Sequence, residues 1–476
     1  MQNKKKVLII APHPDDEINL AGQLCITLKR NKYEFFVVYI TNGDYKKSIG
    51  NKRLYEALEA NSVLGIPSSN IIILGYANEY EGPIHIYNAL EDSCLKSKIG
   101  KKRTNSIKEK PEYCFKKKGI HRKFNKKSIR YDFESVMLEL LPDLIICPEF
   151  DSHPDHRATS LLFDEVMCDI LKKKSWYRPI VLKKYIHEGV WSGPKDYYEF
   201  PMRPTLTSGP RFYSGMLHEL DTPNLKWDER ICWKPDQKTL TPLLIKNIVF
   251  NAARKHRSTT AWYEMQRVIN ADMVYWHKPT DNIALNAEVL VSSGNGKYVN
   301  DYKYYDSDDL YNINNPFTKP ECFCWQPDAL DKKKSVELRF TEDQVIKCIR
   351  IYEDCNWENH IKSIVLDSDE KTLYKGPLNN DGSKTEIILN EKIYTKSIIL
   401  YICDYDGNPG IAEIEVFSEN VKSPQLLLRK GARENKAKNT VGLFRKIEKM
   451  MLILIFLFKF KIRYEFEKIW FNRFDD

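Results

Sequence analysis

Short apolar runs alternate with amphipathic stretches over the first half of the chain. We predict buried strands at residues 6–11, 35–40, 71–74, 144–147 and 181–187. Between and after them, apolar residues at helical spacing predict helices at residues 18–29, 49–64, 129–141, 158–172 and 243–256. This alternation is typical of βαβ units, whose right-handed crossovers make the strands parallel. We therefore predict an α/β domain, with a Rossmann-like parallel sheet covered by helices on both faces.

The pattern changes near residue 280, where short apolar runs alternate with turn residues. These runs lie at residues 335–340, 346–352, 361–366, 387–389, 398–403 and 411–417. Such spacing is typical of an all-β sandwich. We predict an α/β domain over residues 1–275, an independently folding sandwich over 281–418, and a basic and apolar tail over 425–476. Residues 191–242 are rich in Pro, Trp and Tyr, which predicts irregular loops.

One strongly basic segment interrupts the α/β pattern. Residues 96–130 contain fifteen Lys or Arg against Glu109 and Glu112. The segment is either a solvated loop or a lid that attracts an anionic substrate, because concentrated positive charge raises the local concentration of anions. Its aromatic residues are too few for a stacking platform, so we expect no nucleic acid partner.

The tail combines positive charge with an apolar run. Residues 429–449 contain eight Lys or Arg, and residues 450–458 are continuously apolar. Nine residues of helix span about 14 Å, too short for a hydrocarbon core of about 30 Å. The tail either docks on the protein or binds the membrane surface peripherally.

The expected location is cytoplasmic, with the tail as a candidate contact on the inner face of the membrane. The basic start of the chain is followed too soon by polar residues to be a signal peptide. Eleven irregularly spaced cysteines indicate reduced thiols rather than a disulfide framework.

Two polar motifs follow predicted strands, where ligands bind in open α/β sheets. The first is His-Pro-Asp-Asp-Glu at residues 13–17, and the second is His-Pro-Asp-His at 153–156. Such turns also cap helices, since Asp is a good N-cap. Two motifs at equivalent places in one sheet argue against capping alone.

The residue types suit metal-assisted hydrolysis. Catalytic zinc takes three protein ligands and a water, and we expect one zinc ion per chain at His13, Asp16 and His156. The bound water needs a base, for which Asp15 is free. His153 is then available to protonate the leaving atom, with Asp155 orienting it through the other ring nitrogen.

These motifs resemble the LmbE-like/PIG-L family of zinc-dependent N-acetylglucosamine deacetylases. The resemblance covers about residues 5–265 and extends to Arg53 and Glu56, and faintly to residues 256–258. It implies a Rossmann-like fold and removal of an acetyl group from an amino sugar. It also implies zinc at His13, Asp16 and His156, Asp15 as the base, and His153 as an acid and oxyanion stabiliser. The resemblance also implies that Arg53 contacts the substrate, and we add Asn42, in the loop after the second strand.

A weaker resemblance covers residues 281–418. The stretch Asn-Ile-Ala-Leu-Asn at residues 282–286 and the stretch Gly-Ile-Ala-Glu-Ile-Glu-Val at 410–416 look like a discoidin-like (coagulation-factor type C) β-sandwich. That resemblance implies carbohydrate or lipid-headgroup binding at loops on one end.

Three functions are consistent with these features. The first is an N-deacetylase acting on a GlcNAc-type sugar joined to an anionic group, such as a nucleotide, a lipid diphosphate or a glycan. The second is a zinc amidase on a non-sugar amide, because fold and metal do not determine the acyl acceptor. The third is a glycan-binding scaffold with an inert hydrolase domain, against which the complete set of catalytic residue types argues.

Overall fold

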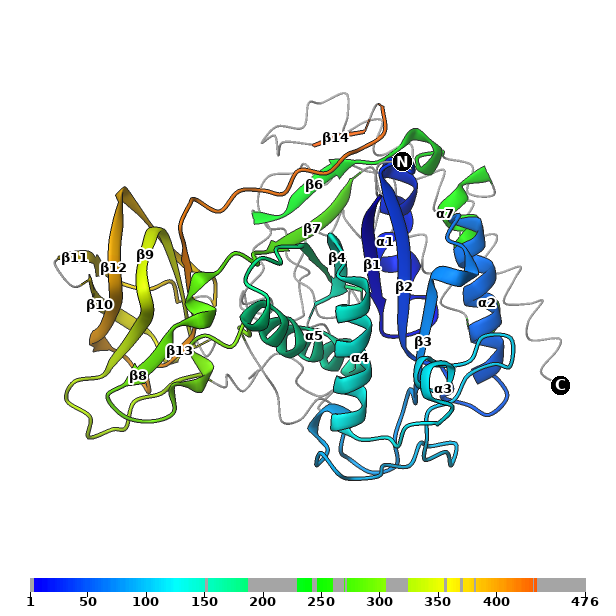
Figure 1. Cartoon of the computed structure of the whole chain (residues 1–476), viewed down its shortest axis with the longest axis horizontal. Coiled ribbons are helices and arrows are strands. Elements are labelled where there is room, and N and C mark those ends of the chain that lie inside the picture. The colour runs from blue at the N-terminus through cyan, green and yellow to red at the C-terminus, as the bar shows by residue number, and fades with distance from the viewer. Residues whose placement is uncertain are drawn as a thin grey trace.

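The computed structural model describes most of the chain in two parts, an α/β part and a smaller β part (Figure 1). It describes residues 4–149, 153–186, 229–241, 246–259, 269, 272–304, 324–354, 358–368, 371–380, 382–430 and 432–434.

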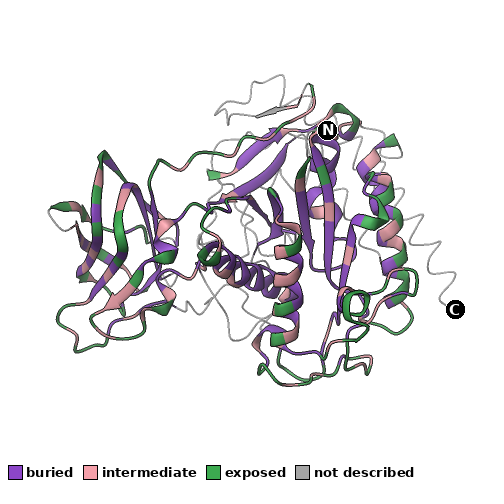
Figure 2. Cartoon of the chain, viewed as in Figure 1, coloured by how far each residue is buried: buried purple, intermediate pink, exposed green. Residues whose placement is uncertain are grey.

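The α/β part is built on one eight-stranded sheet, in the order β14-β6-β7-β5-β4-β1-β2-β3. Its parallel strands are β1 (Lys5–Ala11), β2 (Tyr33–Thr41), β3 (Ile71–Tyr76), β4 (Leu144–Pro148) and β5 (Ile180–Lys184). All five predicted strands are therefore confirmed. They are rich in Ile, Val and Leu because helices cover both faces, and Figure 2 shows these strands buried.

Two layers of helices cover the sheet. On one face lie α1 (Asp16–Thr27), α2 (Gly50–Val63) and α7 (Ile248–Ala253), and on the other lie α4 (Lys126–Leu140) and α5 (Pro154–Lys173). Single-turn 3₁₀ helices are η1 (Ser68–Asn70), η2 (Ile86–Asn88) and η4 (Gln237–Thr239). The predicted α/β class, with helices on both faces, is confirmed.

The far side of the sheet differs from a purely parallel design. Beyond β5 come β7 (Met273–Lys278), β6 (Ile231–Lys234) and β14 (Arg433–Glu434), all antiparallel to their neighbours. β6 falls within residues 191–242, which we predicted as irregular loops; most of that range lies outside the described residues. The predicted domain boundary at residue 275 falls inside β7, so the first domain's sheet extends at least to Lys278.

The basic segment folds into a layer beside the ends of β2 and β3. It follows η2 along the chain and contains α3 (Tyr113–Lys118), and short backbone pairings join residue 81 to 96, 95 to 124, and 104 to 122. Asn105 N–H donates to the Gly75 carbonyl at the end of β3. The φ of Gly75 is 80°, and a Cβ there would lie 2.5 Å from the Asn105 oxygen, so glycine is required at this position.

The β part is an antiparallel β-sandwich, as predicted. Its strands are β8 (Glu288–Val291), β9 (Ser335–Glu353), β10 (Ile361–Ser368), β11 (Thr372–Gly376), β12 (Thr385–Tyr405) and β13 (Ile411–Phe417), with η7 (Ile283–Asn286) and η8 (Gly296–Tyr298) before β9. The apolar runs predicted as separate strands within β9 and β12 are each one long strand. The pairing of β9 with β12 shifts register twice, and both halves of each strand contribute to one core.

The two parts share buried side chains. Lys278 of β7 is 2.8 Å from Asp164 of α5, and its Nζ donates to the Tyr302 carbonyl at 2.8 Å. Leu285 and Tyr352 pack in the same apolar cluster as α4 and α5. The sandwich is therefore bonded to the α/β part through a common core rather than tethered by a linker.

The chain returns to the α/β part after the sandwich. Leu428 bridges Leu28 at the end of α1, and Arg429 N–H donates to the Thr27 carbonyl. None of the described helices is both long and apolar enough to cross a membrane. The apolar run at residues 450–458 lies outside the described residues, so the cytoplasmic location and the membrane contact of the tail stay predictions.

This arrangement predicts that truncation before β7 destabilises the α/β part. A chain ending at Asn270 lacks β7 and leaves the edges of β5 and β6 without their partner. We expect that chain to be insoluble or to unfold at a clearly lower temperature than a chain ending at Glu434, measured by soluble yield and thermal unfolding. A soluble, cooperatively unfolding 1–270 chain would contradict the shared core.

Candidate metal centre

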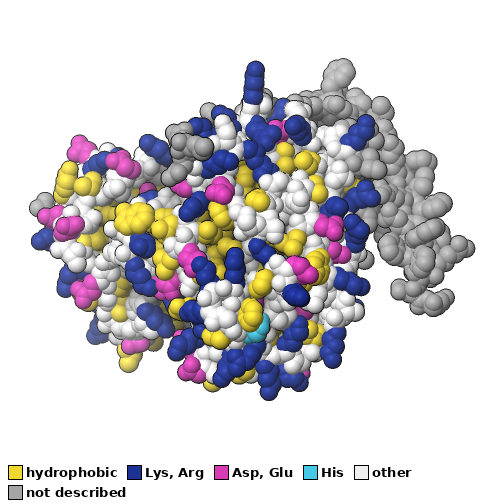
Figure 3. Space-filling view, turned by 45° about the vertical axis from the view of Figure 1, so that its right-hand side comes forward, with side chains coloured by type: hydrophobic (Ala, Val, Ile, Leu, Met, Phe, Trp, Pro, Cys, Tyr) yellow, Lys and Arg dark blue, Asp and Glu magenta, His cyan; other side chains and the backbone are white. Residues whose placement is uncertain are grey.

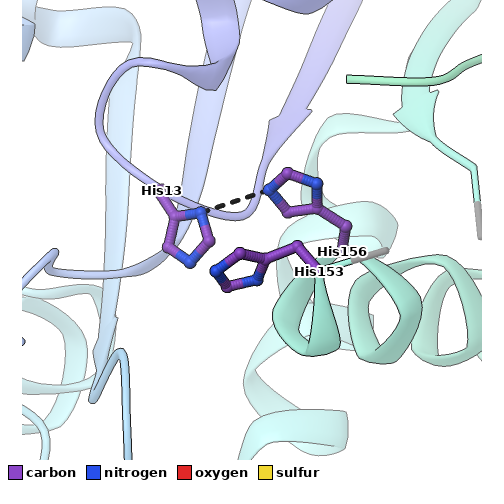
Figure 4. A group of neighbouring side chains, drawn as sticks. All are labelled: His13, His153 and His156. Carbon is purple, nitrogen blue, oxygen red and sulfur yellow. Dashed lines mark hydrogen bonds between the residues drawn. The ribbon is translucent and has the colours of Figure 1, made fainter. Parts of the chain in front are cut away.

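Three imidazoles converge at the carboxyl edge of the sheet. His13 lies in the turn between β1 and α1, while His153 and His156 lie at the start of α5 (Figure 4). One ring nitrogen from each lies within 4.8 Å of the others. His13 and His156 are buried, and His153 is partly exposed. This is a group that could hold a metal ion.

The predicted ligand set forms a tighter triangle. His13 Nδ1 is 3.0 Å from Asp16 Oδ2, and His156 Nε2 is 3.3 Å from each of those two atoms. A tetrahedral zinc ion with ligands at 2.0–2.1 Å separates its ligand atoms by about 3.3 Å. The three atoms are therefore spaced as neighbouring ligands of one small cation, and His153 lies beside them with its ring centroid 4.7 Å from that of His156.

The charge state of Asp16 agrees with this role. Burial by itself would raise the pKa of the Asp16 carboxyl, but His156 and His13 outweigh burial and hold this pKa well below its ordinary value. The carboxylate is thus anionic, as a metal ligand must be.

Asp155 orients His13. Its Oδ2 is 2.8 Å from His13 Nε2, and its Oδ1 is 2.8 Å from His85 Nε2. His85 Nδ1 accepts the Tyr87 N–H, so its Nε2 carries the proton donated to Asp155. When His13 likewise donates from Nε2, its Nδ1 presents a lone pair to the candidate cation.

This placement of Asp155 differs from the predicted one. We expected its carboxylate to orient His153, but Oδ2 is 4.0 Å from His153 Nδ1. The Asp155 backbone N–H donates to that nitrogen instead, at 3.2 Å, so the His153 ring caps α5. Burial opposes ionisation of Asp155, but the hydrogen bonds from His13 and His85 outweigh it and lower its pKa far below the ordinary value.

His85 is a site residue that the sequence did not reveal. It comes from the loop before η2, 70 residues before Asp155, and is 3% exposed. A single histidine in a segment without periodic pattern carries no signal of its own. Only the fold brings it to the metal centre.

Asp15 lies in a strained turn next to the candidate metal ligands His13 and Asp16. Its φ is 148° and its ψ is −24°, a conformation that costs a non-glycine residue about 1–3 kcal/mol. Its Oδ2 is 2.9 Å from Arg53 Nη2, which also donates to the Pro14 carbonyl. Burial raises the pKa of the Asp15 carboxyl, and this effect exceeds the opposing effect of Arg53.

The two predicted substrate-binding residues are placed differently. Arg53 is buried and directed at Asp15, beside the metal group. Asn42 is 1% exposed, and its Oδ1 accepts the Asp44 N–H within the loop after β2. Its Nδ2 lies 3.5 Å from the Asn105 carbonyl, so its side chain joins this loop to the basic segment.

Comparison with known proteins identifies the α/β part. Residues 8–167 match the sequence model of the family PIG-L, described as GlcNAc-PI de-N-acetylase. Over these residues the chain is similar to the PIG-L family. Residues 282–417 match a domain of unknown function, DUF7402.

One curated relative is the N-acetylglucosaminyl-phosphatidylinositol de-N-acetylase of Bos taurus. It is 33% identical over 69 residues, which are 14% of this chain and 27% of that protein. The matched part thus spans about a quarter of the relative's length.

Solved structures resemble each part. The N,N'-diacetylchitobiose deacetylase of Pyrococcus horikoshii is 21% identical and covers 39% of this chain and 62% of its own, with a TM-score of 0.26. The family 32 carbohydrate-binding module of Streptococcus pneumoniae EndoD is 13% identical and covers 29% of this chain and 99% of its own, with a TM-score of 0.23.

The ligand set is open to a direct test. We expect purified protein to contain about one divalent metal ion per chain, most readily zinc, and His156→Ala to lose most of it because one corner of the triangle is removed. Elemental analysis measures this, with His360→Ala as a control that removes an imidazole in the β part. Full metal retention in His156→Ala would refute the assignment.

Proposed function

We propose that the chain is a zinc-dependent N-deacetylase that removes an acetyl group from a GlcNAc-type amino sugar. The observation that carries the proposal is the triangle of His13, Asp16 and His156 with Asp15 beside it, inside the region similar to the PIG-L family. The curated relative is named as a de-N-acetylase of an N-acetylglucosaminyl lipid, which supports an acetylated amino sugar as the substrate class.

His13, Asp16 and His156 would hold the ion. When bound, zinc supplies a water of lowered pKa and polarises the amide carbonyl. The protein's own groups then move the protons. The raised pKa of Asp15 suits a base that accepts a proton from the attacking water.

His153 is the candidate donor to the leaving nitrogen. Because its Nδ1 accepts the Asp155 N–H, its Nε2 carries the proton in the neutral ring. The ring is partly exposed and therefore accessible to a substrate. During cleavage of the amide bond, Asp15 thus accepts a proton from the water and His153 donates a proton to the leaving nitrogen.

Mutation can separate the residues that transfer protons from those that hold the metal. Asp15→Asn should retain the metal but lose about 10²–10⁴-fold in kcat, because the water no longer meets a base, and His153→Ala should behave similarly. Acetate release and metal content measure this, with Asp44→Asn, a buried carboxyl in the loop after β2, as the control. Near-normal turnover in both variants would place the chemistry elsewhere.

A panel of substrates distinguishes the alternatives. Acetate release from amino sugars but not from simple acetamides supports the deacetylase. The reverse pattern supports a zinc amidase on a non-sugar amide. No release from any substrate by metal-loaded protein supports a glycan-binding scaffold.

We further propose that the acetylated sugar is joined to an anionic group. Six exposed residues of the basic segment make no ion pair with any described acidic side chain: Lys102, Arg103, Lys108, Lys116, Lys118 and Lys123. The Lys96 carbonyl of this segment accepts the N–H of Glu81, in the loop that leads to His85 of the metal centre, and Lys101 Nζ is 3.7 Å from Asp44. Figure 3 shows Lys and Arg side chains gathered along the lower part of the molecule in that view.

Reversing this charge should affect binding rather than chemistry. The triple change Lys102→Glu, Arg103→Glu and Lys123→Glu should raise KM for UDP-N-acetylglucosamine several-fold, with kcat and the KM for neutral diacetylchitobiose little changed. The increase should shrink at ~0.5 M salt, because salt screens exposed charges.

The matched control reverses three exposed lysines of the β part, at Lys332, Lys333 and Lys375. An equal increase in KM for both substrates, or for both triple variants, would contradict an anion-binding role for the basic segment.

A further inference from the structure

We propose that the segment following α7, through His256 and Ser258, positions Asp15 for catalysis; this inference rests on the proposed role of Asp15 as the base. The segment is linked through intermediate residues to the two parts of Asp15 that determine where its carboxylate points, the backbone N–H and the carboxylate itself. One contact chain reaches its backbone through Glu17, and the other reaches its side chain through α2.

The first chain of contacts acts on the strained backbone. The Asp15 N–H donates to Glu17 Oε2 at 2.9 Å, and Glu17 Oε1 is 2.8 Å from His256 Nε2. Glu17 and His256 are 0% and 1% exposed, so water does not compete for these bonds. The Tyr39 hydroxyl is a further hydrogen-bond partner of Glu17. A φ of 148° at Asp15 persists only when neighbouring contacts enforce it, and this bond is directed at that residue's own amide.

The second chain of contacts acts on the carboxylate. Ser258 donates to Glu56 from both its N–H, at 2.9 Å, and its hydroxyl, at 2.6 Å. Glu56 lies one helical turn after Arg53 on α2. Arg53 Nη2 in turn lies 2.9 Å from Asp15 Oδ2. Ser258 therefore fixes the turn of α2 that presents the guanidinium to Asp15.

The segment is itself held firmly against α1. Asn247 caps α7 by accepting the N–H groups of Val249 and Phe250. A Cβ at Gly22 of α1 would lie only 2.9 Å from Val249 Cγ1, so the glycine allows α7 to pack directly on α1, and Figure 1 shows α7 beside α2. His256 follows α7 by one turn, where its N–H donates to the Ala253 carbonyl.

These contacts give His256 a role distinct from that of a metal ligand or a proton carrier. It has no contact with the metal group; it positions the base through Glu17. Its loss should lower the rate of the chemical step because a small misplacement of a reacting group costs up to about 10²-fold. Metal binding and substrate binding should remain.

The experiment compares His256→Leu with His256→Gln in the full chain. The Gln amide reaches the place of Nε2 and can donate to Glu17, whereas Leu fills the space without a donor. We expect His256→Leu to lower kcat about 10–100-fold, with KM and zinc content near wild type. His256→Gln should restore kcat to within about threefold of wild type.

Two further readouts separate positioning from general destabilisation. Hydrogen exchange of the peptide containing residues 11–18 should quicken in His256→Leu and not in His256→Gln, because the Asp15 amide loses its fixed acceptor. Gln23→Leu is the matched control, since it removes another buried hydrogen bond of α1, to Thr239, away from Asp15. It should lower thermal stability without lowering kcat.

Loss of zinc in His256→Leu, or a kcat loss no greater than in Gln23→Leu, would overturn the proposal. Failure of His256→Gln to recover both kcat and slow exchange would also overturn it. If the wild-type chain releases no acetate, the proposed function fails, and the exchange measurement still tests the hydrogen-bond chain from His256 through Glu17 to the Asp15 amide.

Discussion

Parallel pairing of β1 with β4 is the contact on which the candidate site depends. Val7, Leu8 and Ile9 lie in register with residues 144–146 of β4, so the two strands end at the same edge. The turn after β1 carries His13 to Asp16, and the turn after β4 leads to His153 and His156. Residues more than 130 positions apart in sequence meet there because two apolar strands pair in parallel.

Most buried carboxylates at that edge of the sheet are paired with an arginine or histidine side chain. Asp15 has Arg53, Asp155 has the imidazoles of His13 and His85, and Glu17 has His256. A buried carboxylate without a partner is costly, so these pairs are needed for the turn to fold as it does. Asp16 is different because its two imidazole partners also lie 3.3 Å from each other. Its Oδ2 accepts the His13 backbone N–H and faces His13 Nδ1 and His156 Nε2, so one cation between these atoms would satisfy all three side chains.

Much of the α/β part could be predicted because its signals are local. Each parallel strand has an apolar run at its centre, and each candidate metal-site motif comes shortly after such a strand. The contacts that could not be predicted join distant parts of the chain without a pattern: His85 to Asp155, and His256 to Glu17. The role of Asp155 was also missed, because spacing along the chain cannot tell which neighbour its carboxylate faces. β7 and β14 were missed because antiparallel strands need no crossover helix between them, so the alternation of strand and helix that revealed the parallel strands is absent there.

The path of the chain has a consequence for its synthesis. The β-sandwich lies, in sequence, between β7 and β14 of the same sheet, so the last described strand of the α/β part is made after the whole sandwich. Chains emerge from the ribosome N-terminus first, and unpaired strand edges favour association between chains. Among the described strands, β6 lacks its outer partner until Arg433 has been made. Prompt folding of the sandwich therefore shortens the period in which a nascent chain exposes that edge to its neighbours.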